Sequence, residues 1–304
     1  MRRFKCLSMG LLLIMALTAC SSQGSSKETT EKQETEDVKT TAESATETSG
    51  QEASDKETTA ESGTEEKVLI GYSPMTMVNP YFSAVGSAIE EVVAEHGAEL
   101  VKFDPQMDAS VQAAQIDDMI SMGIKALLFI PVDSAGSRNI MQACKDAGVY
   151  VVNIDNVVNE NDYDVVDAIV ASDNYGLGYV SGQDVAERFP DGAKIGIMHS
   201  PTSESCIVTV NAFWDAIKEH AKNPEAYVNV AEADGKGNME QSFTQATDIL
   251  QAHDDIDLFY CVNDQSAFGV IQAIKEAGKA GEIAVYGKDG SPDAKAVLGK
   301  DGFV

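Results

Sequence analysis

Apolar and polar residues follow one another from Val68 onward in a pattern that predicts repeated strand–helix units. Short runs rich in β-branched residues are each followed by a stretch of about 12–16 residues with helical periodicity. In the stretch Tyr81–Glu95 apolar side chains recur with the helical period, Asn79 suits the N-cap and Pro80 suits the first helical position. Continuous apolar strands that alternate with helices predict an α/β fold of parallel sheets covered on both faces.

The strand–helix units fall into two series, which predict two doubly wound parallel-sheet lobes. The first series predicts strands at Val68–Tyr72, Glu99–Phe103, Ala126–Ile130, Tyr150–Ile154 and Val165–Ala171, and helices at Tyr81–Glu95, Ser110–Ser121 and Ala135–Asp146. The second predicts strands at Lys194–Met198, Tyr227–Ala231, Leu258–Val262 and Ile283–Tyr286, and helices at Tyr175–Arg188, Cys206–Ala221, Met239–Gln251, Gln265–Glu276 and Pro292–Leu298. We therefore expect an N-terminal lobe at 68–171 and a C-terminal lobe at 172–304, joined by hinge crossings near Ala171–Asn174.

The residues before Val68 have a different composition. A basic start, Met1–Lys5, precedes the apolar run Cys6–Leu17, which is too short for a comfortable transmembrane helix and is typical of a secretory signal. The run ends in Leu17-Thr18-Ala19-Cys20, which resembles the bacterial lipobox, so we expect a signal peptide at 1–19 and lipid attachment at Cys20. An ordinary signal peptide with a chance cysteine is the alternative. Residues 20–67 are rich in Ser, Thr and Glu and predict a disordered acidic tether.

The charge of the chain restricts its partners. The 304 residues include 22 Lys and Arg against 49 Asp and Glu, a formal net charge of −27. Such a chain is repelled by phosphate backbones and anionic lipid surfaces, so we expect no nucleic-acid partner.

Neither the cysteines nor the histidines form a pattern that indicates chemistry. Beyond Cys20 only Cys144, Cys206 and Cys261 remain, an odd number that argues against a disulfide framework; Cys144 and Cys261 read as small core residues. The four histidines lack metal-ligand spacing and are expected at the surface or at helix ends. Nucleophile-elbow, zinc-protease and phosphate-loop motifs are absent from the sequence, so we predict a protein that is not an enzyme and uses no metal or cofactor.

The residues that close the predicted strands indicate a ligand site. Ligands of open parallel sheets bind beyond the carboxyl ends of the strands. These positions carry mostly amides and carboxylates, which suit a neutral ligand rich in hydroxyl groups, while Tyr81 and Phe82 offer flat faces to the C–H side of a sugar ring. The predicted ligand-binding residues are Asn79, Tyr81, Phe82, Asp155, Asn156, Asn263 and Asp289.

Four short motifs in this order resemble the type I periplasmic binding proteins of the ribose/galactose-binding kind. They are Asn79-Pro80-Tyr81-Phe82, Ala171-Ser172-Asp173-Asn174, Asn263-Asp264 and the segment from Gly287 to Asp293. The resemblance covers the chain from about Val68 to Val304. It implies ligand contacts from Asn79, Phe82, Asp155, Asn263 and Asp289, with Tyr81 as an aromatic wall.

The chain departs from the family pattern at four places. Asn156 stands where the family commonly has an arginine, and the helix that starts near Cys206 also lacks the usual arginine, with Thr209 as the nearest match. A bidentate clamp on adjacent hydroxyl groups is thus missing. Lys288 stands where an aromatic or small residue is usual and could receive an anionic group. The family also continues about 30–40 residues beyond the Gly-Phe-Val stretch, so we expect the first lobe to lack its last elements.

The resemblance implies an extracytoplasmic, lipid-anchored, monomeric protein that captures a sugar or polyol and delivers it to an ABC transporter permease. A receptor that presents its ligand to a membrane sensor, for chemotaxis, a histidine kinase or a quorum signal, is the alternative, because the same fold serves both roles. A LacI-type regulator shares the fold, but an export signal and an acidic tether stand in place of its basic DNA-binding headpiece.

Overall fold

The computed structural model describes residues 67–299. These residues belong to one compact unit, Gly63–Val304, which contains two parallel β-sheets. The predicted signal peptide, the predicted lipid attachment at Cys20 and the predicted tether before Lys67 lie outside the described residues. None of the described helices is long and apolar enough to span a membrane.

The first sheet has the strand order β2-β1-β3-β4-β5, and every pairing in it is parallel. Its elements, in chain order, are β1 (Leu69–Ser73), α1 (Pro80–Glu95), β2 (Glu99–Lys102), α2 (Ala109–Ser121), β3 (Ala126–Phe129), α3 (Arg138–Asp146), β4 (Tyr150–Ile154), the 3₁₀ helix η1 (Glu160–Val165) and β5 (Ala168–Val170). The chain runs from β1 outward to β2 and then returns to the other side of β1, so the order reverses between β1 and β3. Ligands of such sheets bind at this reversal point.

The second sheet repeats the arrangement with the order β7-β6-β8-β9, again all parallel. Its elements are α4 (Asn174–Arg188), β6 (Ala193–His199), α5 (Glu204–His220), the 3₁₀ helix η2 (Pro224–Ala226), β7 (Tyr227–Asp234), α6 (Met239–Ala252), β8 (Leu258–Cys261), α7 (Asp264–Glu276), β9 (Ala284–Tyr286) and α8 (Pro292–Val297). The reversal lies between β6 and β8. The predicted fold class, two doubly wound α/β lobes, is confirmed.

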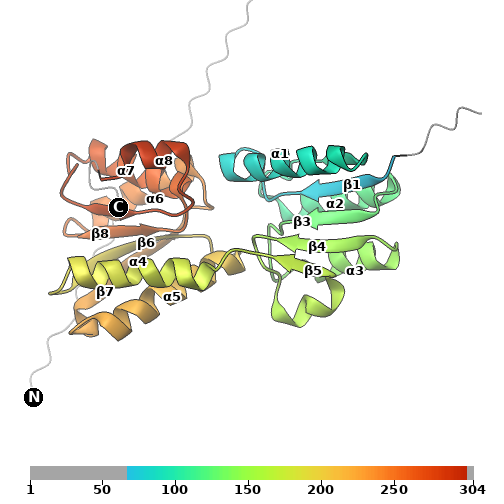
Figure 1. The fold of residues 1–304 in the computed structure, drawn as a ribbon. Helices are drawn as coiled ribbons and strands as arrows, with labels where there is room; N and C mark the ends of the chain where they lie inside the picture. Colours follow the sequence, from blue (N-terminus) through green and yellow to red (C-terminus); the bar gives the residue numbers. More distant parts are fainter. Residues whose placement is uncertain (1–66, 300–304) are drawn as a thin grey trace, which may run out of the picture. The chain divides into compact units, whose positions relative to one another are not determined.

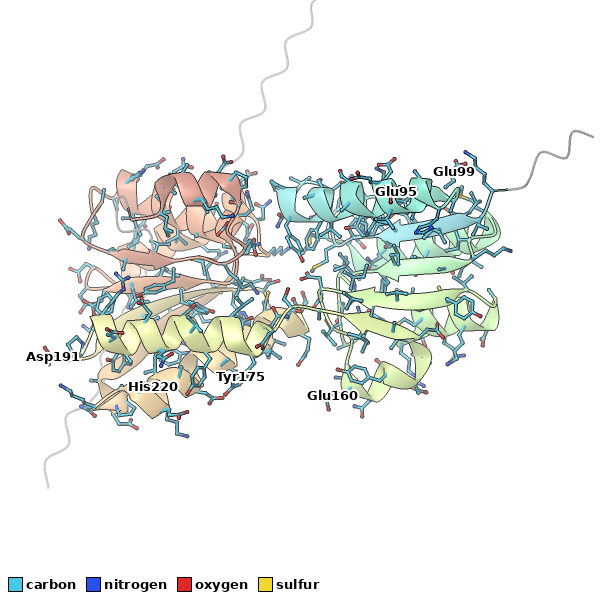
Figure 2. All side chains as sticks on the ribbon, in the orientation of Figure 1. Glu95, Glu99, Glu160, Tyr175, Asp191 and His220 are labelled. Carbon is cyan, nitrogen blue, oxygen red and sulfur yellow. The ribbon has the colours of Figure 1, made fainter. Side chains whose placement is uncertain are left out.

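The inner strand β8 is buried on both of its faces, and its alternate residues point to opposite sides of the sheet. On β8, Phe259 and Cys261 pack into the cluster formed with α6 and α7, whereas Leu258 and Tyr260 pack into the cluster formed with α4 and α5. Figure 1 shows α6, α7 and α8 on one side of the second sheet, with α4 and α5 on the other. Charged side chains such as Glu95 remain on the outside (Figure 2).

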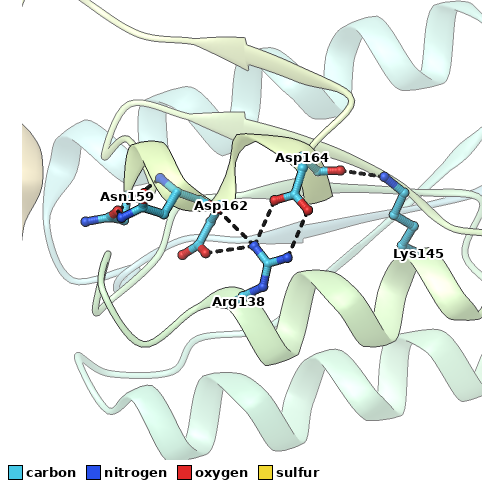
Figure 3. A network of polar contacts seen from close by, with 6 residues as sticks. Arg138, Lys145, Asn159, Asp162 and Asp164 are labelled. Carbon is cyan, nitrogen blue, oxygen red and sulfur yellow. Dashed lines mark hydrogen bonds and ion pairs between the residues drawn. The ribbon is translucent and has the colours of Figure 1, made fainter.

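The strand predicted at Val165–Ala171 is shorter in the structure. Only Ala168–Val170 forms β5, and the chain before it turns into η1. Figure 3 shows the reason: Arg138 on α3 donates hydrogen bonds to both carboxylate oxygens of Asp164, at 2.8 and 2.9 Å, and to Asp162 at 3.0 Å. Lys145 also donates to the Asp164 carbonyl at 2.6 Å. These bonds hold η1 against α3 and delay the start of the strand.

The predicted helix Ala135–Asp146 also begins late, at Arg138. Asp133 accepts a hydrogen bond from the backbone N–H of Ala135 at 3.0 Å, and the Ser137 hydroxyl donates to the Asp133 carbonyl. These local bonds favour a turn over a helix, which is the usual effect of Asp and Ser side chains on the adjacent backbone. All the predicted helices and strands, these two included, agree with the structure to within three residues at each end.

Candidate functional site

A cavity of about 970 Å³ is lined by loops that follow the strands of both sheets. Its volume lies at the upper end of the range for small-molecule sites. Six of the seven predicted ligand-binding residues line it: Asn79, Tyr81, Phe82, Asp155, Asn263 and Asp289. Residues that are far apart in the sequence thus meet at one place, as expected for the carboxyl ends of parallel strands. Contact of these side chains with a ligand stays a prediction.

The start of α1 positions an amide and two aromatic rings. The Asn79 side-chain oxygen caps the helix by accepting from the backbone N–H of Tyr81 at 2.9 Å, and Pro80 occupies the first turn. Among the described residues, the hydrogen bond of the Asn79 side chain is the one to its Oδ1, and its NH₂ group has no protein acceptor. Tyr81 and Phe82 meet edge to face with ring centroids 5.3 Å apart. This corner offers a hydrogen-bond donor beside an apolar wall.

Asp155 follows β4 and sits in the left-handed backbone region, with φ of 60°. Its Oδ1 accepts a hydrogen bond from the Tyr81 hydroxyl at 3.1 Å. Burial raises the pKa of Asp155, while the bond from Tyr81 and the charge of Lys288 partly offset that rise. The remaining lone pairs of the carboxylate can accept hydrogen bonds from ligand hydroxyl groups.

The second lobe contributes Asn263 and Asp289. Asn263 caps α7, because its Oδ1 accepts from the Ser266 N–H at 2.8 Å, and its amide donates to the Gly237 carbonyl at 3.1 Å. Asp289 also has a positive φ, 100°. Burial and, after it, the neighbouring charge of Asp264 raise the pKa of Asp289 to about 7. Asp155 and Asp289 therefore differ, since among the described residues only Asp155 of the two accepts a hydrogen bond from a protein hydroxyl group.

Asn156 does not line this cavity, which departs from the predicted set. Its side chain is 1% exposed, and its amide donates to the Pro131 carbonyl at 2.7 Å. Its Oδ1 accepts from the Ser134 and Ser203 hydroxyls, each at 3.0 Å, and from the Ser205 N–H at 3.3 Å. Every polar atom of the side chain is therefore engaged by protein from both lobes. The geometry gives Asn156 a joining role between the lobes.

The sequence reasoning missed the polar residues of the lobe crossing and of the loop after β6. Asn174 lines the cavity, and Ser203, Ser205 and Cys206 line it beside α5. Burial raises the pKa of the Cys206 thiol, so its thiolate form is disfavoured. The only available signal for a ligand site at these residues was their position soon after a strand. That signal indicates a site only when the fold shows that the loop after β6 lies near the first lobe.

The histidine prediction was wrong for one of the four residues. His199 ends β6 and is 6% exposed, whereas His96 and His220 are exposed; Figure 2 labels His220 on α5. Burial lowers the pKa of His199 against the opposing effects of Glu232 and Asp234. Within residues 67–299 no group of three or more His, Cys, Asp or Glu side chains could hold a metal ion.

Comparison with known proteins places these features in a family. Residues 70–304 match the family model described as a periplasmic binding protein domain. The ribose import binding protein of Bacillus subtilis is 29% identical over 234 residues, covering 77% of this chain and 73% of the relative. A solute-binding protein of an ABC transporter from Mycobacterium smegmatis, solved with bound glycerol, is 27% identical with a TM-score of 0.71 and covers 79% of this chain and 81% of that chain. The Caulobacter myo-inositol binding protein shares the fold, with a TM-score of 0.71 at 24% identity, over 77% of this chain and 78% of that chain.

Proposed function

Because the chain belongs to the periplasmic binding protein family, we propose that it is an extracytoplasmic solute-binding lipoprotein that captures a sugar or polyol and delivers it to an ABC transporter permease. The observation that carries the proposal is a cavity lined by Asn79 and Asp155 of the first lobe and by Asn263 and Asp289 of the second. The names of the relatives, which include ribose and allose binding proteins, support the ligand class.

The lining suits a polyhydroxylated ligand. The free NH₂ group of Asn79 donates, and the carboxylates of Asp155 and Asp289 accept, so neighbouring hydroxyl groups can be held as both acceptors and donors. Tyr81 and Phe82 provide an apolar face for the C–H groups of a ring. Hydrogen bonds to charged groups contribute more than neutral ones, about 1.5–3 kcal/mol each, so the carboxylate of Asp155 should contribute strongly to the affinity.

Ligand contacts from both lobes would couple binding to closure. A ligand shifts an open–closed equilibrium only by its differential affinity for the two states, and a ligand held by both lobes has such a difference. We propose lobes at 68–171 and 172–304, with Ser172–Asn174 as one crossing between them and with Asn156 as a joint that keeps the β6 loop close to the first lobe.

The same proposal includes an anchor and an oligomeric state. Residues 1–19 would be removed, Cys20 would carry the lipid, and residues 20–67 would tether a monomer to the outer face of the membrane. Replacement Cys20→Ala should release the protein from the membrane fraction into the soluble extracytoplasmic fraction. Fatty-acid labelling that persists in Cys20→Ala would contradict the anchor, and a dimer in light scattering would contradict the monomer.

Calorimetric titration with ribose, allose, myo-inositol and glycerol tests the binding function. We expect one of these classes to bind and to raise the melting temperature. Replacement Asp155→Ala should weaken that binding by more than about 2 kcal/mol, while the exposed Asp146→Ala on α3 should leave it unchanged. Equal affinities in all three proteins would overturn the site. Recovery of chemically altered ligand after incubation would show an enzyme instead of a binding protein.

A further inference from the structure

Lys288 brings a positive charge to the wall of the cavity. It lies in the loop between β9 and α8, next to Asp289. Its Nζ donates to Asn174 Oδ1 at 3.3 Å and to Thr209 Oγ1 at 3.4 Å. Both acceptors are neutral, and both residues are buried, at 8% and 0% exposure.

The hydrogens of this cluster can be assigned. The Thr209 hydroxyl donates to the Ser205 carbonyl at 2.7 Å, and the Asn174 amide donates to the Ser172 carbonyl at 3.3 Å. Each group therefore presents a lone pair to Lys288. An ammonium group has three N–H donors, and these two acceptors use two of them. Among the described residues, no acceptor takes the third donor and no carboxylate forms an ion pair with Lys288.

The nearby carboxylates do not neutralise this charge by contact. Lys288 is close enough to Asp155 and Asp289 for its charge to lower the pKa of both, yet it is bonded to neither. Burial and Asp264 act in the opposite direction on Asp289, whose pKa of about 7 leaves it partly protonated near neutral pH. Repulsion of a ligand anion by Asp289 is reduced accordingly.

We infer that the cavity selects a polyhydroxylated ligand that carries a carboxylate, a sugar acid of the uronate or aldonate class, with its carboxylate on the free N–H of Lys288. The inference rests on the proposed function, because the hydroxyl groups of the same ligand would be held by Asn79 and Asp155. A carboxylate pairs with an ammonium group by a charge-assisted hydrogen bond, which is stronger than a bond from Lys288 to a hydroxyl group. The rival role for Lys288 is that of a counter-ion for Asp155 and Asp289 in a site for neutral sugars.

The test uses matched ligands and variants of the full chain in calorimetric titration. The ligands are galactose with galacturonate and galactosamine, glucose with glucuronate, and ribose with ribonate. The variants are Lys288→Met, which keeps an unbranched side chain one atom shorter and without the charge, and Lys288→Arg, which keeps the charge. Lys222→Met serves as the control, because it removes one charge from an exposed position outside the cavity lining.

We expect an acid to bind more tightly than its neutral partner and galactosamine to bind most weakly. Lys288→Met should weaken acid binding by roughly 10- to 100-fold and neutral binding by less than about threefold, with Lys288→Arg restoring most of the acid affinity. Preference for neutral or amino sugars, or equal losses for acid and neutral ligands in Lys288→Met, would overturn the inference and leave the binding function standing. No binding of any sugar or polyol by the folded protein would overturn both.

Discussion

In the first lobe the buried side chain of Gln112 connects two cavity loops by hydrogen bonds. In the second lobe glycine residues, which have no Cβ atom, allow helices α4 and α5 to approach each other closely. Gln112 on α2 is 1% exposed; its amide donates to Pro74 and Ile130 carbonyls at 3.0 and 2.9 Å, and its oxygen accepts from the Val132 N–H at 2.9 Å. These bonds join the loops after β1 and β3, at the reversal of strand order.

The second lobe has its corresponding contacts between helix backbones. A Cβ atom on Gly178 would lie 2.0 Å from the Thr209 carbonyl oxygen, and one on Gly182 would lie 2.1 Å from that of Phe213. Helices α4 and α5 therefore touch backbone to backbone, and Thr209, which faces Lys288, is held at this contact. The first lobe depends here on hydrogen bonds that are lost when the Gln112 amide is removed. The second lobe depends on close helix packing that an added methyl group disrupts.

The largest effect should come from Gln112→Leu. Leucine fills similar space but leaves the buried Val132 N–H and the Pro74 and Ile130 carbonyls without partners, so we expect a loss of about 3 kcal/mol in the free energy of unfolding. Urea denaturation would measure it. Gln115→Leu, one turn further along α2, is the control, because Gln115 makes a single bond, to the Asp104 carbonyl at 3.0 Å. Equal losses in the two variants would show that the loops do not depend on Gln112.

A smaller loss, about 2 kcal/mol, should follow from Gly182→Ala. The added methyl group forces α4 away from α5, a cost that exceeds the gain in helix propensity. Thermal and urea unfolding would report it, with the neighbouring exposed Gln183→Ala expected to stay within about 0.5 kcal/mol of the parent. A stabilised Gly182→Ala would show that the two helices separate freely.

The cavity carboxylates allow the lobes to be compared through their chemistry. Tyr81→Phe removes the donor to Asp155, which should raise the pKa of Asp155 further and lower ligand affinity by about 1 kcal/mol, measured by calorimetry. Tyr175→Phe is a matched control, since its hydroxyl also donates to an aspartate, Asp215 at 3.3 Å, but on the exposed surface of α4. Equal changes in ligand affinity in Tyr81→Phe and Tyr175→Phe would show that the hydrogen bond to Asp155 does not affect ligand binding.

A separate effect should be the pH dependence that Asp289 confers. Its pKa of about 7 lies above the ordinary value of 3.8, so its protonated form stabilises the fold at low pH and this contribution is lost as pH rises from about 4 through about 7. Asp289→Asn should therefore gain stability relative to the parent over that range. Asp293→Asn, an exposed position on α8, is the control. A difference between Asp289→Asn and the parent that stays constant with pH would contradict the raised pKa.

The strand–helix series could be predicted from sequence because it depends on local periodicity and on caps such as Asn79 and Pro80, which act within a few residues. The cavity position of Asn79, Asp155, Asn263 and Asp289 could also be predicted, because parallel strands bring their carboxyl ends to one edge. Where distant partners decide the local structure the predictions failed, as for η1, which Arg138 holds against α3.

The sequence by itself determined two α/β lobes and the loops that carry polar side chains. Only the tertiary structure decided that Asn156 joins the lobes from a buried position outside the cavity, and that Lys288 and Thr209, 79 residues apart, are neighbours in its wall. The physical reason is the distance along the chain over which each interaction acts. Propensity and periodicity act along the chain, whereas the burial and hydrogen-bond partners of an amide or an ammonium group depend on segments that folding alone brings together.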